Sequence, residues 1–115
     1  MGRRSRQRER LVAPVSEYRD DDGNVLSLRA SLTPGSRRQY RELSGAGLDR
    51  EDAWQRAVEF LFERLAVVWS IAGLELEGQK QLLSRYRLAS EEERRFVRQA
   101  LREHVSEHFP EMEAP

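Results

Sequence analysis

The stretch from Asp49 to Gly73, DREDAWQRAVEFLFERLAVVWSIAG, most constrains what this chain can fold into. Apolar residues recur along it at helical spacing, at Trp54, Val58, Leu61, Leu65, Val68 and Ala72. Asp49 is placed to cap the first turn, and Gly73 is placed to end the last one. The second half is apolar almost all round, which is typical of a helix buried among several partners. We therefore predict one long central helix around which the chain folds.

A β-hairpin is predicted ahead of this helix, over residues 14–32. The first strand is Val15 to Arg19, and the second is Val25 to Leu32, where apolar and polar residues alternate. The intervening residues 20–24, DDDGN, favour a tight turn because acidic side chains bond to nearby backbone and glycine accepts positive φ. A lone hairpin is marginally stable in water, so its apolar face should pack on the helices or on another chain.

Shorter helices are predicted on both sides of the central one. Thr33 and Pro34 suit the cap and first position of a helix that runs to about Ser44, where Gly45 and Gly47 would end it. After the central helix, residues 74–78 read as a linker and residues 79–87 as a helix.

The last predicted helix has the clearest start signal in the chain. Ser90 and Glu93 have the spacing of a capping box, in which each side chain bonds to the backbone of the other residue. The helix should run from Glu91 to about His108 and end before Pro110.

These elements predict an α+β fold, an N-terminal two-stranded hairpin packed on three to four helices. A chain of 115 residues is long enough for one hydrophobic core. We expect a disordered basic arm over residues 1–13, a single domain over 14–109 and a flexible tail over 110–115.

Composition excludes several classes of function. The formal net charge is zero, from 20 basic and 20 acidic residues, so a basic field over the whole protein is absent. The chain has no cysteine, which excludes disulfides, thiolate catalysis and zinc–thiolate sites. No apolar run approaches the length of a membrane span. We expect a cytoplasmic protein.

Two clusters have some features of metal sites. His104 and His108 are spaced i, i+4, which can place two ligands on one helix face, but no further His or Cys exists to complete a site. Imidazoles near a helix C-terminus, where the dipole favours them, explain the pair more simply. The aspartates of residues 20–22 resemble the start of a calcium loop, but its twelfth position would be Ser31 instead of a glutamate.

A third cluster has the spacing of paired catalytic carboxylates. Glu59 and Glu63 lie one helical turn apart, and Arg56 and Arg64 lie within a turn of them. A solvated charged face explains this arrangement better than general acid–base catalysis. We therefore expect a protein without catalytic residues, metal or cofactor.

Protein partners are the expected ligands. Trp54 and Trp69 would lie on roughly one side of the predicted central helix, either as core residues or as part of a groove for a partner helix. The candidate partner-binding residues are Leu28, Leu32, Trp54, Phe62, Val68 and Trp69. The hairpin edge and the very apolar helix also favour a homo-oligomer.

An alternative is a small regulator that binds nucleic acid through its N-terminal arm. Five arginines crowd the first ten residues: Arg3, Arg4, Arg6, Arg8 and Arg10. Arginines neutralise phosphates and release counterions. The arm has no interleaved aromatic residues, however, so nucleic acid is not the expected main partner.

The layout resembles the small tail assembly chaperones of long-tailed bacteriophages. Those chains begin with a hairpin whose second strand leads into a helix through a "Leu-Thr" step, here VLSLRASLT over residues 25–33. They continue with a long helix that ends in an apolar-Trp-x-apolar-x-Gly segment, here VVWSIAG over residues 67–73, and then a helical tail. The resemblance implies a non-enzymatic adaptor that holds tape-measure and tail-tube proteins during assembly in the host cytoplasm.

Overall fold

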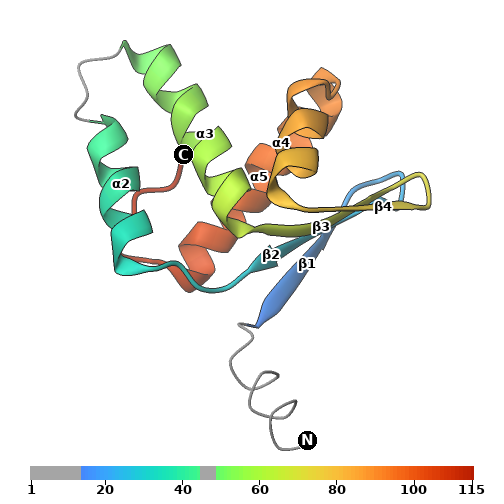
Figure 1. Ribbon diagram of the computed structural model, residues 1–115, viewed down its shortest axis with the longest axis horizontal. Coiled ribbons are helices and arrows are strands. Elements are labelled where there is room, and N and C mark those ends of the chain that lie inside the picture. The colour runs from blue at the N-terminus through green and yellow to red at the C-terminus, as the bar shows by residue number, and fades with distance from the viewer. Residues whose placement is uncertain (1–13, 45–48) are drawn as a thin grey trace, which may run out of the picture.

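The computed structural model describes residues 14–44 and 49–115. They form an α+β fold with a four-stranded antiparallel sheet and four helices (Figure 1). In chain order the elements are β1 (Val15–Arg19), β2 (Val25–Arg29), α2 (Pro34–Ser44), α3 (Arg50–Leu65), β3 (Ala66–Ile71), β4 (Leu74–Glu77), α4 (Gln79–Arg87) and α5 (Glu91–His108). The predicted arm, with its arginines, and the predicted helix stop at Gly45 and Gly47 lie outside the described residues.

The α+β class is confirmed, but the predicted central helix is wrong in its second half. Helix α3 ends at Leu65, and the chain continues directly into strand β3. A continuous apolar run fits a buried strand as well as a buried helix, so periodicity alone cannot separate the two. The run AVVWSI is rich in β-branched and aromatic residues, which favour a strand.

A tight turn after β3 replaces the predicted end of the helix. Ala72 and Gly73 both have positive φ, 52° and 81°, as the central residues of a type I′ hairpin turn do. The segment Leu74–Glu77, predicted as part of a linker, is therefore strand β4, paired with β3. The sheet consists of two hairpins, so the prediction of a single two-stranded hairpin missed strands β3 and β4.

The sheet has the order β1-β2-β3-β4, and every pair is antiparallel. Its register shifts between Ser27 and Leu28, which pair with Val68 and Ala66, so Val67 is the extra residue of a bulge. Strand β2 ends at Arg29, three residues before the predicted Leu32.

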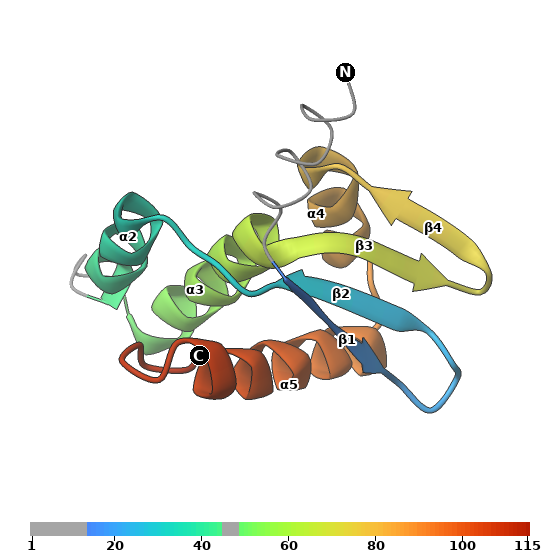
Figure 2. The ribbon, with the colours of Figure 1, turned by 90° about the horizontal axis from the view of Figure 1, so that it is seen from below.

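Helices lie against one face of the sheet only. Figure 2 shows the strands from the face that no described helix covers, with α3 and α5 behind them. Side chains on the helix-facing side, including Leu26, Leu28 and Trp69, are fully or almost fully buried. Their neighbours along the strands, such as Ser27 and Val68, are half-buried on the open face. Helix α2 packs on α3, away from the sheet.

Three of the predicted helix starts, those of α2, α3 and α5, are confirmed by their capping bonds. Asp49 Oδ1 accepts from the Asp52 backbone N–H at 2.9 Å, and Thr33 Oγ1 accepts from that of Ser36 at 3.0 Å. Ser90 and Glu93 form the predicted capping box, with reciprocal distances of 3.1 and 2.9 Å. Such caps each stabilise a helix by about 1 kcal/mol.

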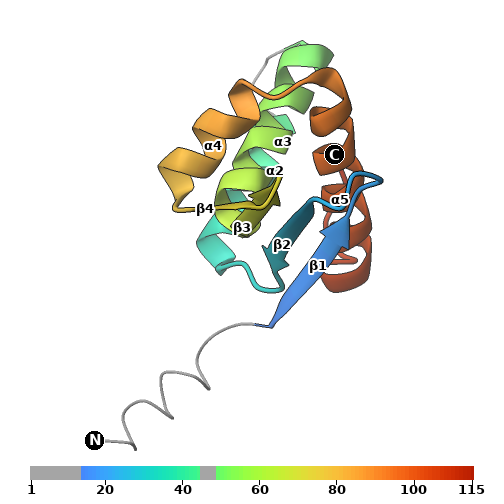
Figure 3. The same ribbon diagram turned by 90° about the vertical axis from the view of Figure 1, so that its right-hand side faces the viewer.

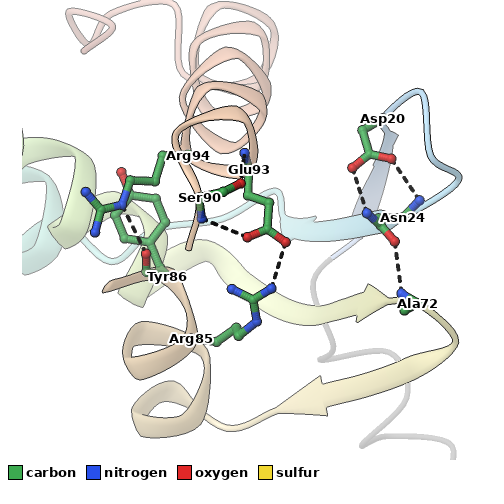
Figure 4. A network of polar contacts seen from close by, with 8 residues as sticks. All are labelled: Asp20, Asn24, Ala72, Arg85, Tyr86, Ser90, Glu93 and Arg94. Carbon is green, nitrogen blue, oxygen red and sulfur yellow. Dashed lines mark hydrogen bonds and ion pairs between the residues drawn. The ribbon is translucent and has the colours of Figure 1, made fainter. Parts of the chain in front are cut away.

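The Asn24 side chain links the two hairpin turns by a hydrogen bond. The Asp20 carboxylate accepts from the backbone N–H groups of Asp22 and Asn24, and Asn24 Oδ1 accepts from the Ala72 N–H at 3.0 Å (Figure 4). The predicted turn at residues 20–24 is thus hydrogen-bonded to the turn between β3 and β4, which lies at the same end of the sheet.

The residues predicted as a flexible tail contact α2. Arg37 pairs with Glu111 at 2.6 Å, and the Tyr40 hydroxyl donates to the Glu113 carbonyl at 2.6 Å. In the described part of the chain, no helix combines the length and hydropathy that a bilayer crossing requires.

Candidate functional site

Three of the six candidate partner-binding residues lie in the core. Leu28, Phe62 and Trp69 are each at most 1% exposed. Trp69 packs edge-on against Phe62, with ring centroids 5.7 Å apart, and the Arg85 guanidinium lies over its indole. A partner could reach these side chains only if the core opened.

The other three do not adjoin one another. Leu32 and Trp54 are partly buried against the core from different elements, and the guanidinium of Arg98 lies 5.1 Å from the centre of the Trp54 ring. Val68 lies on the open face of the sheet, opposite Ser27 in the strand pairing. The six residues therefore do not form one exposed groove.

The two histidines join α5 to the sheet. His104 is fully buried, and its Nε2 lies 2.9 Å from the Arg29 carbonyl oxygen. A carbonyl only accepts, so Nε2 donates, and the other nitrogen, Nδ1, accepts from the Tyr18 hydroxyl at 2.9 Å. His108 Nε2 lies 3.1 Å from Ser16 Oγ. The imidazoles of α5 thus hold the helix-facing side chains of β1.

Glu59 of helix α3 forms an ion pair with helix α4. Glu59 accepts two hydrogen bonds from the Arg87 guanidinium, at 2.8 and 3.2 Å, which joins α3 to α4. Within residues 14–44 and 49–115, no group of three or more histidines and carboxylates is placed to hold a metal ion.

The site that the structure offers instead is a groove beside strand β1. It lies between β1 with its turn on one side and residues 90–103, from the Ser90 cap along most of α5, on the other, and has a volume of about 810 Å³. Figure 3 shows α5 running alongside β1 at this edge of the sheet. We call it the edge groove.

The backbone of β1 is available to the edge groove. In the described part of the chain β1 is the outermost strand and pairs only with β2. Pro14 accepts from the Ala30 N–H, and the Asp20 N–H donates to the Asn24 carbonyl, so the even-numbered residues of β1 bond to β2. The amide and carbonyl groups of Val15, Glu17 and Arg19 consequently point away from β2.

The lining of the edge groove is strongly acidic. Its carboxylates outnumber its guanidinium groups, Arg19 and Arg95, by more than three to one. The carboxylates are those of Glu17, Asp20, Asp21, Asp22, Glu92, Glu93 and Glu103. The ion pair with Arg85, at 2.7 Å, together with the Ser90 backbone bond, lowers the pKa of Glu93 (Figure 4). That carboxylate therefore stays charged well below neutral pH.

The α5 wall combines charge with an aromatic side chain. Glu92, Phe96, Gln99 and Glu103 follow one another at spacings of four, three and four residues, which places them on one helix face. The Tyr18 side chain lies across from them, and burial raises the pKa of its hydroxyl, which stays protonated. The groove thus offers backbone hydrogen bonds, negative charge and apolar contact together.

Sequence reasoning missed this site. The acidic turn at residues 20–24 was predicted from its local backbone bonding alone, which gives no sign of a groove beside it. The spacing of Glu92, Gln99 and Glu103 was a usable signal for a polar helix face, but their position opposite an edge strand depends on the tertiary fold.

No protein-family model, curated protein or solved structure matches this chain.

Proposed function

We propose that this chain is a non-enzymatic adaptor that binds an extended basic segment of a partner protein in the edge groove. The segment adds to β1 as a further antiparallel strand. One observation carries the proposal: the groove has the outward-facing backbone of an edge strand on one side and an acidic helix face on the other.

Strand addition uses each part of the groove. Backbone hydrogen bonds to Val15, Glu17 and Arg19 would supply affinity that does not depend on the partner's sequence. Alternate side chains of the bound segment would face α5, where Glu92 and Glu103 favour arginine or lysine and Phe96 favours their methylene stems. Exposed ion pairs contribute only about 0.2–1 kcal/mol each, so several must act together with the backbone bonds.

The setting that we propose for this adaptor is phage tail assembly, with tape-measure or tail-tube proteins as partners. Support comes from the hairpin that leads through Thr33 into a helix, since β2 and α2 are arranged as the resemblance implies. The second motif of that resemblance, VVWSIAG, falls on β3 and its turn instead of on a helix end.

A direct test titrates the full-length protein with a labelled octapeptide of alternating arginine and threonine, followed by fluorescence polarisation. We expect saturable binding that weakens as salt rises, because the contacting charges are exposed. The double variant Glu92→Arg, Glu103→Arg should lose binding. The matched variant Glu75→Arg, Glu77→Arg, on the opposite edge strand β4, should retain it.

A second peptide tests the strand geometry. Replacing the threonines with proline removes the N–H groups that would face β1 but keeps every arginine. We expect this peptide to bind much more weakly. Equal affinity of the two peptides would show that charge alone holds them, and a loss caused by the β4 variant would place the site elsewhere.

A further inference from the structure

The chain itself contains a segment with the chemistry that the edge groove selects. Arg4, Arg6, Arg8 and Arg10 occupy every second position of the N-terminal arm, residues 1–13. In an extended strand, residues two apart lie on the same face. All four guanidinium groups would then lie on one face of the bound segment, and Arg3 and Glu9 would lie on the other.

We propose that the edge groove binds the N-terminal arm of a second copy of this chain, as an added strand beside β1. The proposal rests on the function proposed above and names a partner for the same site. The arginine face of the arm meets Glu92 and Glu103 on α5. On the opposite face, Glu9 lies on the same side of the sheet as Arg19 of β1.

The place where the arm joins the fold favours exchange between copies. The arm leads directly into Pro14 and β1, at the end of the strand away from the Asp20–Asn24 turn (Figure 3). To pair antiparallel with its own β1, the arm would need a tight turn within residues 11–14, Leu-Val-Ala-Pro, which contain no glycine, asparagine or aspartate.

Parallel pairing of the arginine segment with its own β1 is excluded by spacing. A parallel neighbour needs a crossover connection of about a dozen residues or more, whereas only residues 11–13 separate Arg10 from Pro14. A second copy removes both obstacles. An extended arm can reach at most about 45 Å, well beyond the length of the five-residue strand β1.

Reciprocal exchange gives a closed pair. If each copy places its arm in the groove of the other, both β1 edges are covered and neither edge groove is left open for the arm of a third copy. An arm that only one copy donates would leave a groove open and lead to longer chains. We therefore infer a two-fold symmetric dimer.

Charge reversal on each side of the contact tests the inference. The mass of the full-length protein is measured by sedimentation equilibrium at low and high salt. We expect a dimer at low salt whose dissociation constant rises at least about tenfold in high salt. Changing Arg4, Arg6, Arg8 and Arg10 to glutamate should give a monomer, and so should the double variant Glu92→Arg, Glu103→Arg.

Combining both reversals in one chain is the decisive variant. The charges are again complementary, so dimerisation should return, which a merely misfolded variant would not show. The matched control Glu75→Arg, Glu77→Arg should remain dimeric. A wild-type monomer at low salt, a groove variant that still dimerises, or a combined variant that stays monomeric would overturn the inference.

The octapeptide titration separates this inference from the function on which it rests. Peptide binding by a wild-type monomer would keep the basic-segment site and reject the arm as its partner. Failure of both experiments would remove the site itself. Dimerisation that depends on arm and groove without octapeptide binding would restrict the groove to this chain's own arm.

Discussion

Trp69 shows how one residue can fit two different sequence patterns. Its spacing from Trp54 fits one side of a helix, yet it lies in the middle of strand β3 as a core residue that is 1% exposed. Its indole N–H makes no hydrogen bond with a described residue. The contribution of Trp69 to stability is therefore one of packing, mostly against Phe62 and the neighbouring strands.

Trp69→Ala should destabilise the protein by about 3–5 kcal/mol, because it leaves a large cavity in the core. Trp69→Phe should cost much less, since it keeps the aromatic contact and loses no hydrogen bond. Urea unfolding measures both changes. Trp54→Ala, at a partly exposed site on α3, is the comparison and should cost clearly less. Similar losses for the two alanine variants would contradict the placement of Trp69.

His104 makes stability depend on pH. Burial lowers its pKa, with His108 adding to the effect, while the Arg29 carbonyl and Glu107 act in the opposite direction. The unfolded chain, whose histidine has a pKa of about 6.5, therefore binds a proton more readily than the folded chain does. The free energy of unfolding should be constant above this pKa and fall as pH decreases below it.

The pH dependence can be assigned by a variant. Urea unfolding of the wild type and of His104→Gln at a series of pH values between neutral and mildly acidic gives two curves. The wild-type curve should fall more steeply, whatever the absolute stability of the variant, because only it gains a proton at this site on unfolding. Parallel curves would mean that His104 is not the responsible group.

At the scale of elements, the signals that succeeded were local ones. Helices α2, α3 and α5 begin where Thr33, Asp49 and the Ser90 capping box predicted, because each of these caps is formed within a few residues of sequence. The strand β3 was missed because the apolar run of residues 66–71 suits two environments. The positive φ angles at Ala72 and Gly73, which the sequence did not reveal, reverse the chain direction, and β3 therefore pairs with β4 as the first strand of a hairpin.

The turn between β3 and β4 predicts a contrast between two glycines. A Cβ at Gly73 meets no atom within 4 Å, but its φ of +81° disfavours any L side chain. Gly73→Ala should cost about 1–2 kcal/mol in the free energy of unfolding. Gly35→Ala, inside helix α2, should be neutral or stabilise by up to about 1 kcal/mol. Thermal unfolding of both variants checks this, and equal shifts would contradict the turn geometry.

At the scale of the whole molecule, the candidate site arises from the way in which separate elements meet. Glu17 and Arg19 belong to a strand that sequence predicted with correct bounds, and Glu92 and Glu103 belong to a helix that it also predicted. Their common groove exists because the His104 and His108 contacts hold α5 beside β1. No local pattern in either segment encodes that placement, so the sequence alone does not connect the arginines of the arm with the acidic groove that we propose as their binding site.

Amide hydrogen exchange, measured by NMR residue by residue, should record the addition of a strand to β1. In the monomeric variant with the four arm arginines reversed, the amides of Ser16 and Tyr18 bond to β2 and should exchange slowly, whereas those of Glu17 and Arg19 face the groove and should exchange fast. Saturation with the alternating arginine–threonine peptide should slow Glu17 and Arg19 and leave β4 unchanged. If the amides of even-numbered and odd-numbered β1 residues slowed equally, the peptide would stabilise the fold in general. If neither set slowed, the peptide would be bound through its side chains alone.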